Sequence, residues 1–248
     1  MKKLLLILVV LIVVAVIVAA TLPAKLVLSS VLPEAAPVQV DEVTGSIWKG
    51  RAGRVLYKGV DQGRLNWQVR AASLLQGQLD VALDLQGEGI DAVGRVVRER
   101  ERVRVNDARL TVPAARLEPL LDIPALHLTG TVQVDLDEVE LMNRVPTALR
   151  GSATWHDAGV TGADQAAFGT LVARFGPLPT GGFGGVVEDQ GGPLELDGQF
   201  KTTLMGYEAE AILRARNDDP QVTRALRHIG EIQPDGSVLY QVKGGLGR

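Results

Sequence analysis

The sequence predicts a mainly β protein: a single N-terminal transmembrane helix followed by a curved antiparallel meander sheet with two or three short helices. Three observations predict this class. An uncharged apolar run opens the chain, a period-two alternation of apolar and polar residues dominates the rest, and glycine and proline are frequent, at 28 and 12 residues. The sheet could take the form of a groove, a sandwich or a partly open barrel.

The apolar run covers residues 4–20, which are all Leu, Ile, Val or Ala, and no charge stands between Lys3 and Lys25. A helix over the uncharged stretch spans about 30 Å, the thickness of the hydrocarbon core of a bilayer. A cleaved signal peptide is the alternative, but its apolar core is usually shorter, at about 7–15 residues. By the positive-inside rule Lys2 and Lys3 stay in the cytoplasm. We therefore expect a cytoplasmic stub and single-pass anchor over residues 1–24, with the bulk of the chain outside the cytoplasm.

The rest of the chain alternates in a way that gives each strand one dry and one wet face, which is typical of antiparallel strands. The clearest strands are predicted at residues 64–70, 78–86, 126–137, 194–201 and 207–216. Turn residues separate such runs at 87–89, 106–107, 143, 159, 162, 181–182 and 191–193. Short helices are predicted at 71–75, 112–121 and 221–228, the last with Asp219 as its N-cap and Pro220 at its first position.

One β-rich domain is expected over residues 25–248. Its segment 176–192 is rich in glycine and shows little periodicity, so it predicts a long loop that could join sub-lobes at about 25–175 and 193–248. An amphipathic sheet with few helices must cover its apolar face by folding on itself, or by forming a groove that a lipid or a partner chain fills.

Composition excludes several functions. The net charge of −3 gives no general attraction to nucleic acid, and the absence of cysteine excludes disulfides, thiolate metal sites and a Cys nucleophile. His127, His156 and His228 lack the spacing of metal ligands, and the common catalytic and phosphate-binding motifs are missing. Asp135 and Asp137 would share a strand face, as a hydrolase could use, but a solvated face is the commoner meaning of such a cluster. No catalytic residue, cofactor or metal is therefore expected.

Four arginines stand at alternate positions between residues 98 and 104. In one extended strand they would line one face and could clamp phosphate, lipid headgroups or an acidic partner. Glu99 and Glu101 lie between them and can neutralise part of this charge, and a charged hairpin tip or protected edge is the commoner meaning of such a run. The basic strip consists of Arg98, Arg100, Arg102 and Arg104.

Two motifs are distinctive: Val-Thr-Gly-Ser-Ile-Trp-Lys-Gly at 43–50, and Ile-Gly-Glu-Ile-Gln-Pro-Asp-Gly at 229–236. In the first, the glycines should bracket a short strand, and the tryptophan offers a large apolar surface with one donor. In the second, the Pro-Asp-Gly sequence is turn chemistry. The candidate partner-binding or structural residues are Gly45, Trp48, Gly50, Trp67, Gly230, Pro234, Asp235 and Gly236.

With the N-terminal anchor and a length near 250, these motifs resemble the type II secretion system protein N family of the general secretory pathway. The resemblance implies a non-catalytic component of the cell inner membrane, with most of the chain in the periplasm. Such a protein helps assemble or stabilise the apparatus that exports folded proteins across the outer membrane, with other envelope components of that apparatus as partners. One departure is that only two lysines precede the anchor, which leaves almost no cytoplasmic tail.

The first motif is also similar in style to AsmA-like envelope proteins. That more distant similarity implies the alternative function, a periplasmic lipid-handling groove. In this chain it would be lined by Leu79, Leu83, Val132, Val134 and their neighbours.

Overall fold

The computed structural model describes residues 38–118, 125–143, 145–203 and 206–244. The chain divides into two compact units, residues 1–100 and residues 101–248. The predicted anchor at residues 1–24 lies outside the described residues. Within the described part, no helix combines the length and the apolar character needed to cross a membrane.

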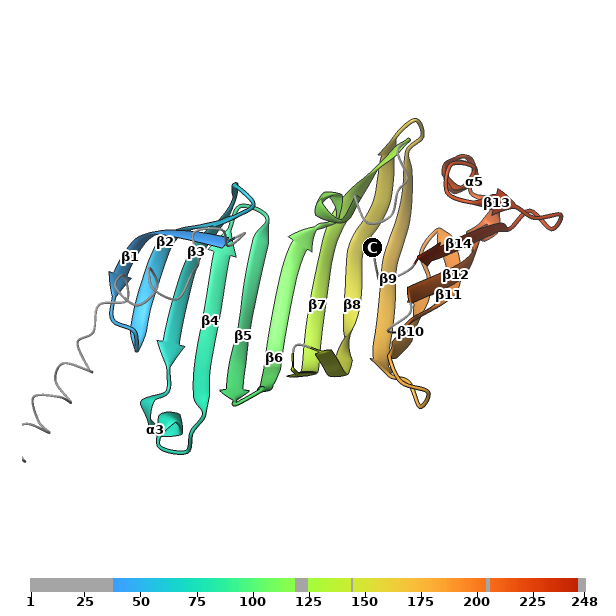
Figure 1. The fold of residues 1–248 in the computed structure, drawn as a ribbon. Coiled ribbons are helices and arrows are strands. Elements are labelled where there is room, and N and C mark those ends of the chain that lie inside the picture. The colour runs from blue at the N-terminus through green and yellow to red at the C-terminus, as the bar shows by residue number, and fades with distance from the viewer. Residues whose placement is uncertain (1–37, 119–124, 144, 204–205, 245–248) are drawn as a thin grey trace, which may run out of the picture. The chain divides into compact units, whose positions relative to one another are not determined.

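The first unit is an antiparallel meander in which the strands pair in chain order (Figure 1). The register aligns Gly50, Trp67 and Leu83 across three neighbouring strands, so the apolar positions of the sequence pattern share one face. Its elements are β1 (Val38–Gly45), β2 (Lys49–Tyr57), β3 (Val60–Val69), α3 (Ala71–Leu74), β4 (Leu79–Gly87) and β5 (Ile90–Glu99).

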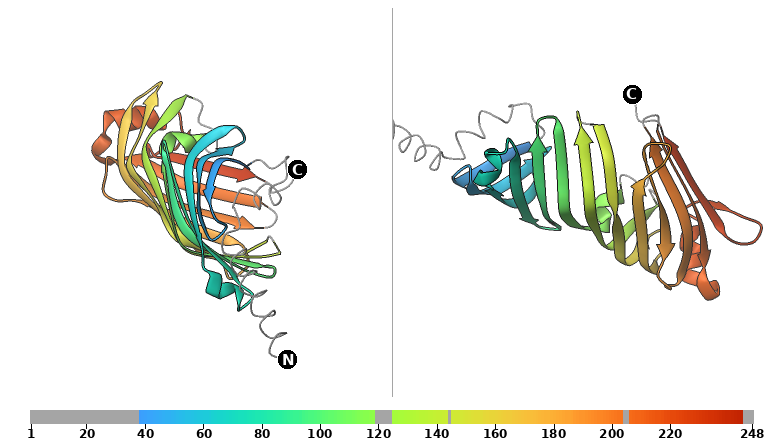
Figure 2. Two further views of the ribbon diagram at one scale, coloured as in Figure 1. Left: turned by 90° about the vertical axis from the view of Figure 1, so that its left-hand side faces the viewer. Right: turned by 90° about the horizontal axis from the view of Figure 1, so that it is seen from below.

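The second unit continues as a meander from β6 to β12, and its last two strands are exchanged in the order β12-β14-β13 (Figures 1 and 2). Its strands are β6 (Arg102–Pro113), β7 (Leu126–Met142), β8 (Val145–Gly162), β9 (Ala166–Pro177), β10 (Phe183–Asp189), β11 (Leu194–Thr203), β12 (Gly206–Ala215), β13 (Glu231–Ile232) and β14 (Val238–Gly244). Its short helices are η1 (Ala114–Leu117), η2 (Arg216–Asp218) and α5 (Pro220–Leu226).

The mainly β class and the antiparallel meander are confirmed, and the sheet is open. Among the described strands, β1 pairs with β2 alone and β13 with β14 alone. Short helices stand in all three predicted places. The second begins later than predicted, because β6 runs on to Pro113 before η1 begins, and residues 119–121 of that prediction lie outside the described residues.

Helix α5 covers part of the second unit's core. It contacts β9 and β12, and its buried side chains are Val222, Ala225 and Leu226. Asp219 caps it as predicted, because its Oδ1 accepts hydrogen bonds from the backbone N–H of Gln221 at 2.8 Å and of Val222 at 3.1 Å. The first unit has no comparable cover among its described residues, and its buried apolar side chains are Ala52 and Val55.

The glycine-rich segment 176–192 forms a hairpin rather than the predicted long loop. β9 extends to Pro177, a turn follows, and β10 fills much of the segment. The alternation of apolar and polar residues does not reveal β10, because its glycines carry no side chains. Neighbouring residues occupy the space that those side chains would fill. A Cβ on Gly185 would lie 2.9 Å from the Phe200 ring, and one on Gly184 would lie 3.0 Å from Leu178.

A second correction concerns two expected turns. Gly159 was expected in a turn but lies inside β8, aligned with Thr129 on β7. Residues 106–107 were also expected to form a turn. They lie inside β6, where Asp107 adopts a φ of 50° without ending the strand. Pairing with the long strand β7 on both sides of this position keeps the ladder continuous.

Candidate binding groove and strand edge of the second unit

One face of the second unit carries an apolar groove of about 390 Å³. The register explains its shape, since a row of small side chains crosses five strands from β8 to β12 and forms the floor. Larger side chains stand beside this row, with Trp155 and Leu171 on one side and Phe200 on the other. The floor row consists of Ala153, Ala173, Val187, Gly198 and Ala211 and ends at Tyr240 on β14.

The groove offers apolar contact and few hydrogen-bonding groups. Its floor strands each pair on both sides, so their backbone N–H and C=O groups are used within the sheet. The indole Nε1 of Trp155 donates to the carbonyl of Thr129 at 2.8 Å. Such a surface suits a hydrocarbon better than a peptide, whose own backbone groups would lose water without finding partners.

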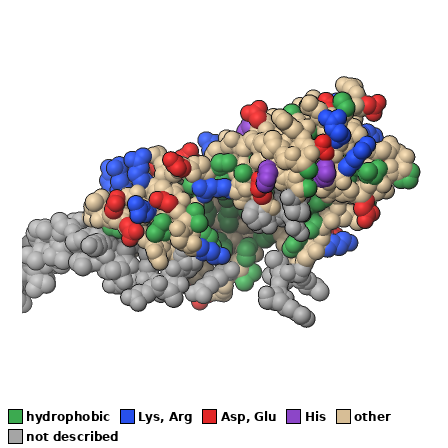
Figure 3. Space-filling view, turned by 90° about the horizontal axis from the view of Figure 1, so that it is seen from above, with side chains coloured by type: hydrophobic (Ala, Val, Ile, Leu, Met, Phe, Trp, Pro, Cys, Tyr) green, Lys and Arg blue, Asp and Glu red, His purple; other side chains and the backbone are tan. Residues whose placement is uncertain are grey.

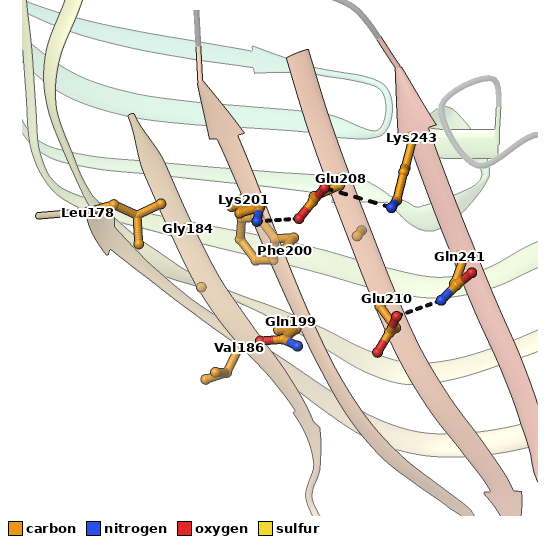
Figure 4. A pocket seen from close by; sticks show the side chains of 12 residues that line it. Leu178, Gly184, Val186, Gln199, Phe200, Lys201, Glu208, Glu210, Gln241 and Lys243 are labelled. Carbon is orange, nitrogen blue, oxygen red and sulfur yellow. Dashed lines mark hydrogen bonds and ion pairs between the residues drawn. The ribbon is translucent and has the colours of Figure 1, made fainter. Parts of the chain in front are cut away.

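The opposite face is polar, and a shallow pocket of about 400 Å³ lies on it (Figure 4). Glu208 stands between two lysines: Lys201 contacts its Oε1, and Lys243 Nζ lies 4.0 Å from its Oε2. The hydrogen bond from Lys201, with the charges of both lysines, holds the pKa of Glu208 below its ordinary value. Two residues further along the same pair of strands, the side chain of Gln241 donates a hydrogen bond to Glu210 at 2.6 Å.

The outer edge of this sheet is only partly covered. The two residues of β13 pair with Val238 and Leu239 at the start of β14. The rest of β14 pairs with β12 on one side, and no described strand pairs with its other side. We call Gln241, Val242, Lys243 and Gly244 the β14 edge.

The first predicted motif forms a tight connection between β1 and β2, not a strand bracketed by glycines. Gly45 and Gly50 face each other across the hairpin, and Gly45 has a φ of +86°. The Ser46 hydroxyl accepts from the backbone N–H of Trp48 and of Lys49, both at 3.3 Å. The Trp67 ring lies on Gly50, where a Cβ would approach the ring to 2.3 Å. This arrangement supports the structural reading of the motif, and its partner-binding role stays a prediction.

The second motif forms the expected turn between β13 and β14. The backbone N–H of Gly236 donates to the carbonyl of Gln233 at 3.0 Å, with Pro234 at the second position and a φ of +82° at Gly236. Asp235 accepts from the Ser237 hydroxyl at 2.6 Å and pairs with Arg214 at 2.7 Å. The hydrogen bonds from Ser237, with the Arg214 charge, hold the pKa of Asp235 below its ordinary value. Before the turn, a Cβ on Gly230 would meet the carbonyl oxygen of Leu239 at 2.4 Å.

The basic strip does not lie along one strand. Arg98 is near the end of β5, Arg100 turns the chain with a φ of 52°, and β6 begins at Arg102. The guanidinium of Arg102 lies 3.7 Å from Glu140, and Arg104 is aligned with the same glutamate on β7. The turn corresponds to the charged-tip alternative, and an anion-binding role of the strip stays a prediction.

Asp135, the first carboxylate of the acidic pair, is held by two partners rather than poised for proton transfer. Asp135 accepts from Gln133 at 2.7 Å and from Arg109 at 2.6 Å, and these bonds hold its pKa below the ordinary value. A general acid working near neutral pH needs the opposite shift. In the described part of the chain, no group of three or more His, Asp or Glu side chains could hold a metal ion.

Of the residues predicted to line a lipid groove, Val132 borders the groove of the second unit, while Leu79 and Leu83 lie on β4 of the first unit. The small residues of the floor were missed. Most of them stand alone between larger residues of their own strand, as Ala173 does between Leu171 and Phe175, so the sequence carries no local signal for the hollow. Acidic and basic side chains are interspersed on the face that Figure 3 shows.

The fold and these surfaces define an open antiparallel sheet protein that offers contact surfaces on both faces and along an edge. The model of the family "Type II secretion system (T2SS), protein N" matches residues 36–243, and the chain belongs to this family of secretion machinery components. No solved structure matches the chain significantly.

Relatives in three bacteria carry the name type II secretion system protein N. The Vibrio cholerae protein is 27% identical over 88% of each chain. The Aeromonas hydrophila protein is 27% identical over 89% of this chain and 77% of its own, and the Pectobacterium carotovorum protein is 26% identical over 82% and 81%. Family membership implies contacts with other components of the type II secretion system.

Proposed function

We propose that the chain is a non-catalytic inner-membrane component of the type II secretion system. It helps assemble or stabilise the apparatus that exports folded proteins across the outer membrane. The family match over residues 36–243 carries the proposal. The uncharged run at residues 4–20, preceded by Lys2 and Lys3, supports an anchor in the inner membrane with both β units in the periplasm.

The proposed mechanism is binding. An open antiparallel sheet has strand edges that accept another strand through main-chain hydrogen bonds, and a polar face that can contact a folded partner. Both features are present in the second unit, at the β14 edge and around Glu208. Other envelope components of the apparatus are the proposed partners.

The test is deletion of the gene, with secretion of type II substrates and assembly of the apparatus measured separately. We expect both to fall and to return when the full chain is supplied. A second complementing chain, with residues 1–24 replaced by a cleaved signal peptide, should be periplasmic and should restore less secretion. Normal secretion with an intact apparatus after deletion would refute the proposal.

A lipid-handling groove is the second candidate, and the apolar groove favours it. Its volume of about 390 Å³ lies within the range of ligand pockets, about 300–1,000 Å³. Its floor has small side chains over paired backbone, which an acyl chain can cover without losing hydrogen bonds.

Native mass spectrometry of the detergent-extracted full chain tests this candidate. Replacing Ala211 on the floor by Phe should displace a co-purified lipid, because the ring would fill the hollow. The matched control is Ile212→Phe, since Ile212 is the neighbouring residue on the opposite face and is 51% exposed. A wild-type chain that carries no lipid would count against the candidate.

A further inference from the structure

The β14 edge is the described edge of the second unit best placed to accept another strand. Its four residues extend for about 14 Å beyond the end of β13. The other described edge strand, β1, is less regular, because Glu42 has a φ of 55° and no aligned partner on β2, although the register is the same on both sides of it. An irregular edge is a device that discourages pairing.

The charge of Lys243 makes the β14 edge favour a strand with acidic side chains. Lys243 is 74% exposed in its side chain and lies 4.0 Å from Glu208, at the limit of an ion pair. Lys201 holds the same carboxylate much more closely, so Glu208 compensates Lys243 only in part. A lysine on a strand edge repels a basic strand and discourages pairing with an apolar one, which would leave the lysine charge uncompensated, whereas an acidic residue directly opposite it is favourable.

The residues between the polar positions of the edge make it favour a strand that also carries apolar side chains. Val242 is aligned with Ala209 and Tyr240 with Ala211, on the face that carries the apolar groove. A strand added beside β14 would therefore place every second side chain on that apolar face and the others beside Gln241 and Lys243.

We propose that the β14 edge binds an extended segment of a partner protein in which apolar residues alternate with acidic ones. This inference rests on the proposed docking role in the secretion apparatus and names the chemistry of the docked segment. The bound segment would extend the sheet, with its acidic side chains opposite Lys243 and its apolar side chains continuing the apolar face.

The experiment uses the detergent-solubilised full chain and three fluorescein-labelled peptides. The acidic peptide is Thr-Val-Glu-Val-Glu-Val-Thr, the basic one has Lys in place of both Glu, and the third has Pro in place of the central Val. Fluorescence anisotropy should show binding of the acidic peptide only, because Pro removes a ladder hydrogen bond and Lys meets Lys243.

Variants of the protein separate charge recognition from loss of folding. Lys243→Glu should weaken the acidic peptide about tenfold and allow the basic peptide to bind. Gln241→Lys should tighten binding of the acidic peptide. The matched control Lys58→Glu makes the same charge change in the first unit and should leave binding unchanged.

Equal binding of acidic and basic peptides, no binding of any peptide, or an equal effect of Lys58→Glu would overturn the inference. Concentration-dependent dimers in sedimentation that Lys243→Glu abolishes would also overturn it, and would assign the edge to a second copy of the chain. These measurements use purified protein, so their failure would leave the secretion phenotype of the deletion strain standing as a separate result.

Discussion

At the scale of single residues, the side chain of Asp189 connects three parts of the second unit. It ends β10, and its side chain is 11% exposed. Its Oδ1 accepts from the backbone N–H of Gly191 at 2.8 Å and from Arg216 at 2.7 Å, and its Oδ2 accepts from the N–H of Leu196 at 3.0 Å. One carboxylate thus fixes the connection between β10 and β11 and holds η2 against it.

The pKa of Asp189 follows from these contacts. Burial alone would raise it, but the backbone N–H groups of Leu196 and Gly191 and the Arg216 guanidinium outweigh burial and hold the pKa below its ordinary value. A carboxyl whose pKa is lowered by folding stabilises the native state above its unfolded pKa, about 3.9. That stabilisation is lost as the pH falls further, through the folded pKa.

We expect Asp189→Asn to lower the free energy of unfolding of the second unit by about 1–3 kcal/mol at neutral pH, since Arg216 loses its charged partner. The loss should be smaller at acidic pH, once the pH has fallen below the unfolded pKa of about 3.9 and through the lower folded pKa, because the wild-type carboxylate is then protonated too. Urea unfolding followed by Trp155 fluorescence, with Trp48 and Trp67 replaced by Phe, measures it.

The control for this prediction is Glu188→Gln, one residue earlier. Glu188 pairs with Arg174 at 3.0 Å, but both side chains are more than half exposed, so the change should stay within about 0.5 kcal/mol. A loss for Asp189→Asn that is the same at both pH values would contradict the proposed role of its charge.

At the scale of elements, the hairpin of β1 and β2 shows how a distinctive motif can be structural. The backbone N–H of Val69, at the end of β3, donates to the carbonyl of Trp48 at 2.7 Å, so the loop is tied to the next strand. Gly50 has no side chain because the Trp67 ring and the carbonyl of Thr44 already occupy that space.

Gly50→Ala should therefore destabilise the first unit by about 1–3 kcal/mol, because its Cβ would lie 2.3 Å from the ring of Trp67 and 2.8 Å from the oxygen of Thr44. Urea unfolding of a Trp155→Phe background, in which Trp48 and Trp67 report, measures the change. Gly176→Ala on β9 of the second unit, followed by Trp155 with Trp48 and Trp67 replaced by Phe, is the control, because nothing lies within 4 Å of a Cβ at that position. An unchanged midpoint for Gly50→Ala would disprove the steric role.

Alternation alone predicted the strands whose two faces differ, such as β4 and β11, and the Pro-Asp-Gly turn followed from local chemistry. Prediction from alternation failed where the contact that determines the structure joins residues far apart in the sequence. β10 looks like a loop because Phe200 and Leu178 fill the space above its glycines. The groove floor could not be predicted, since it draws on five strands whose register places single small residues side by side.

At the scale of the whole molecule, the division into two units at residues 100 and 101 was also hidden in the sequence. The alternating arginines fitted either one continuous strand or a charged hairpin tip, and Arg100 turns the chain with a φ of 52°. Local alternation of charged residues cannot separate a strand from two strands joined by a tight turn, because exposed charges satisfy either geometry.

The two units differ in the core that they bury. In the first unit the described buried apolar side chains are Ala52 and Val55, which are small. The second unit buries larger ones from its strands and from α5, among them Phe168, Leu194 and Leu226. Each Å² of apolar surface removed from water contributes about 25 cal/mol, so the second unit should be the more stable of the two.

We therefore expect the first unit to unfold at a lower urea concentration than the second, by about 1 M or more. The Trp155→Phe chain reports the first unit, and the chain with Trp48→Phe and Trp67→Phe reports the second. Leu194→Ala should lower the free energy of unfolding of the second unit by about 2–5 kcal/mol, because Leu194 is 1% exposed in that core. The urea midpoint of the second unit alone should therefore fall. If both reporters give one midpoint, and Leu194→Ala moves them together, the chain unfolds as one cooperative body and the difference in buried core does not set the order of unfolding.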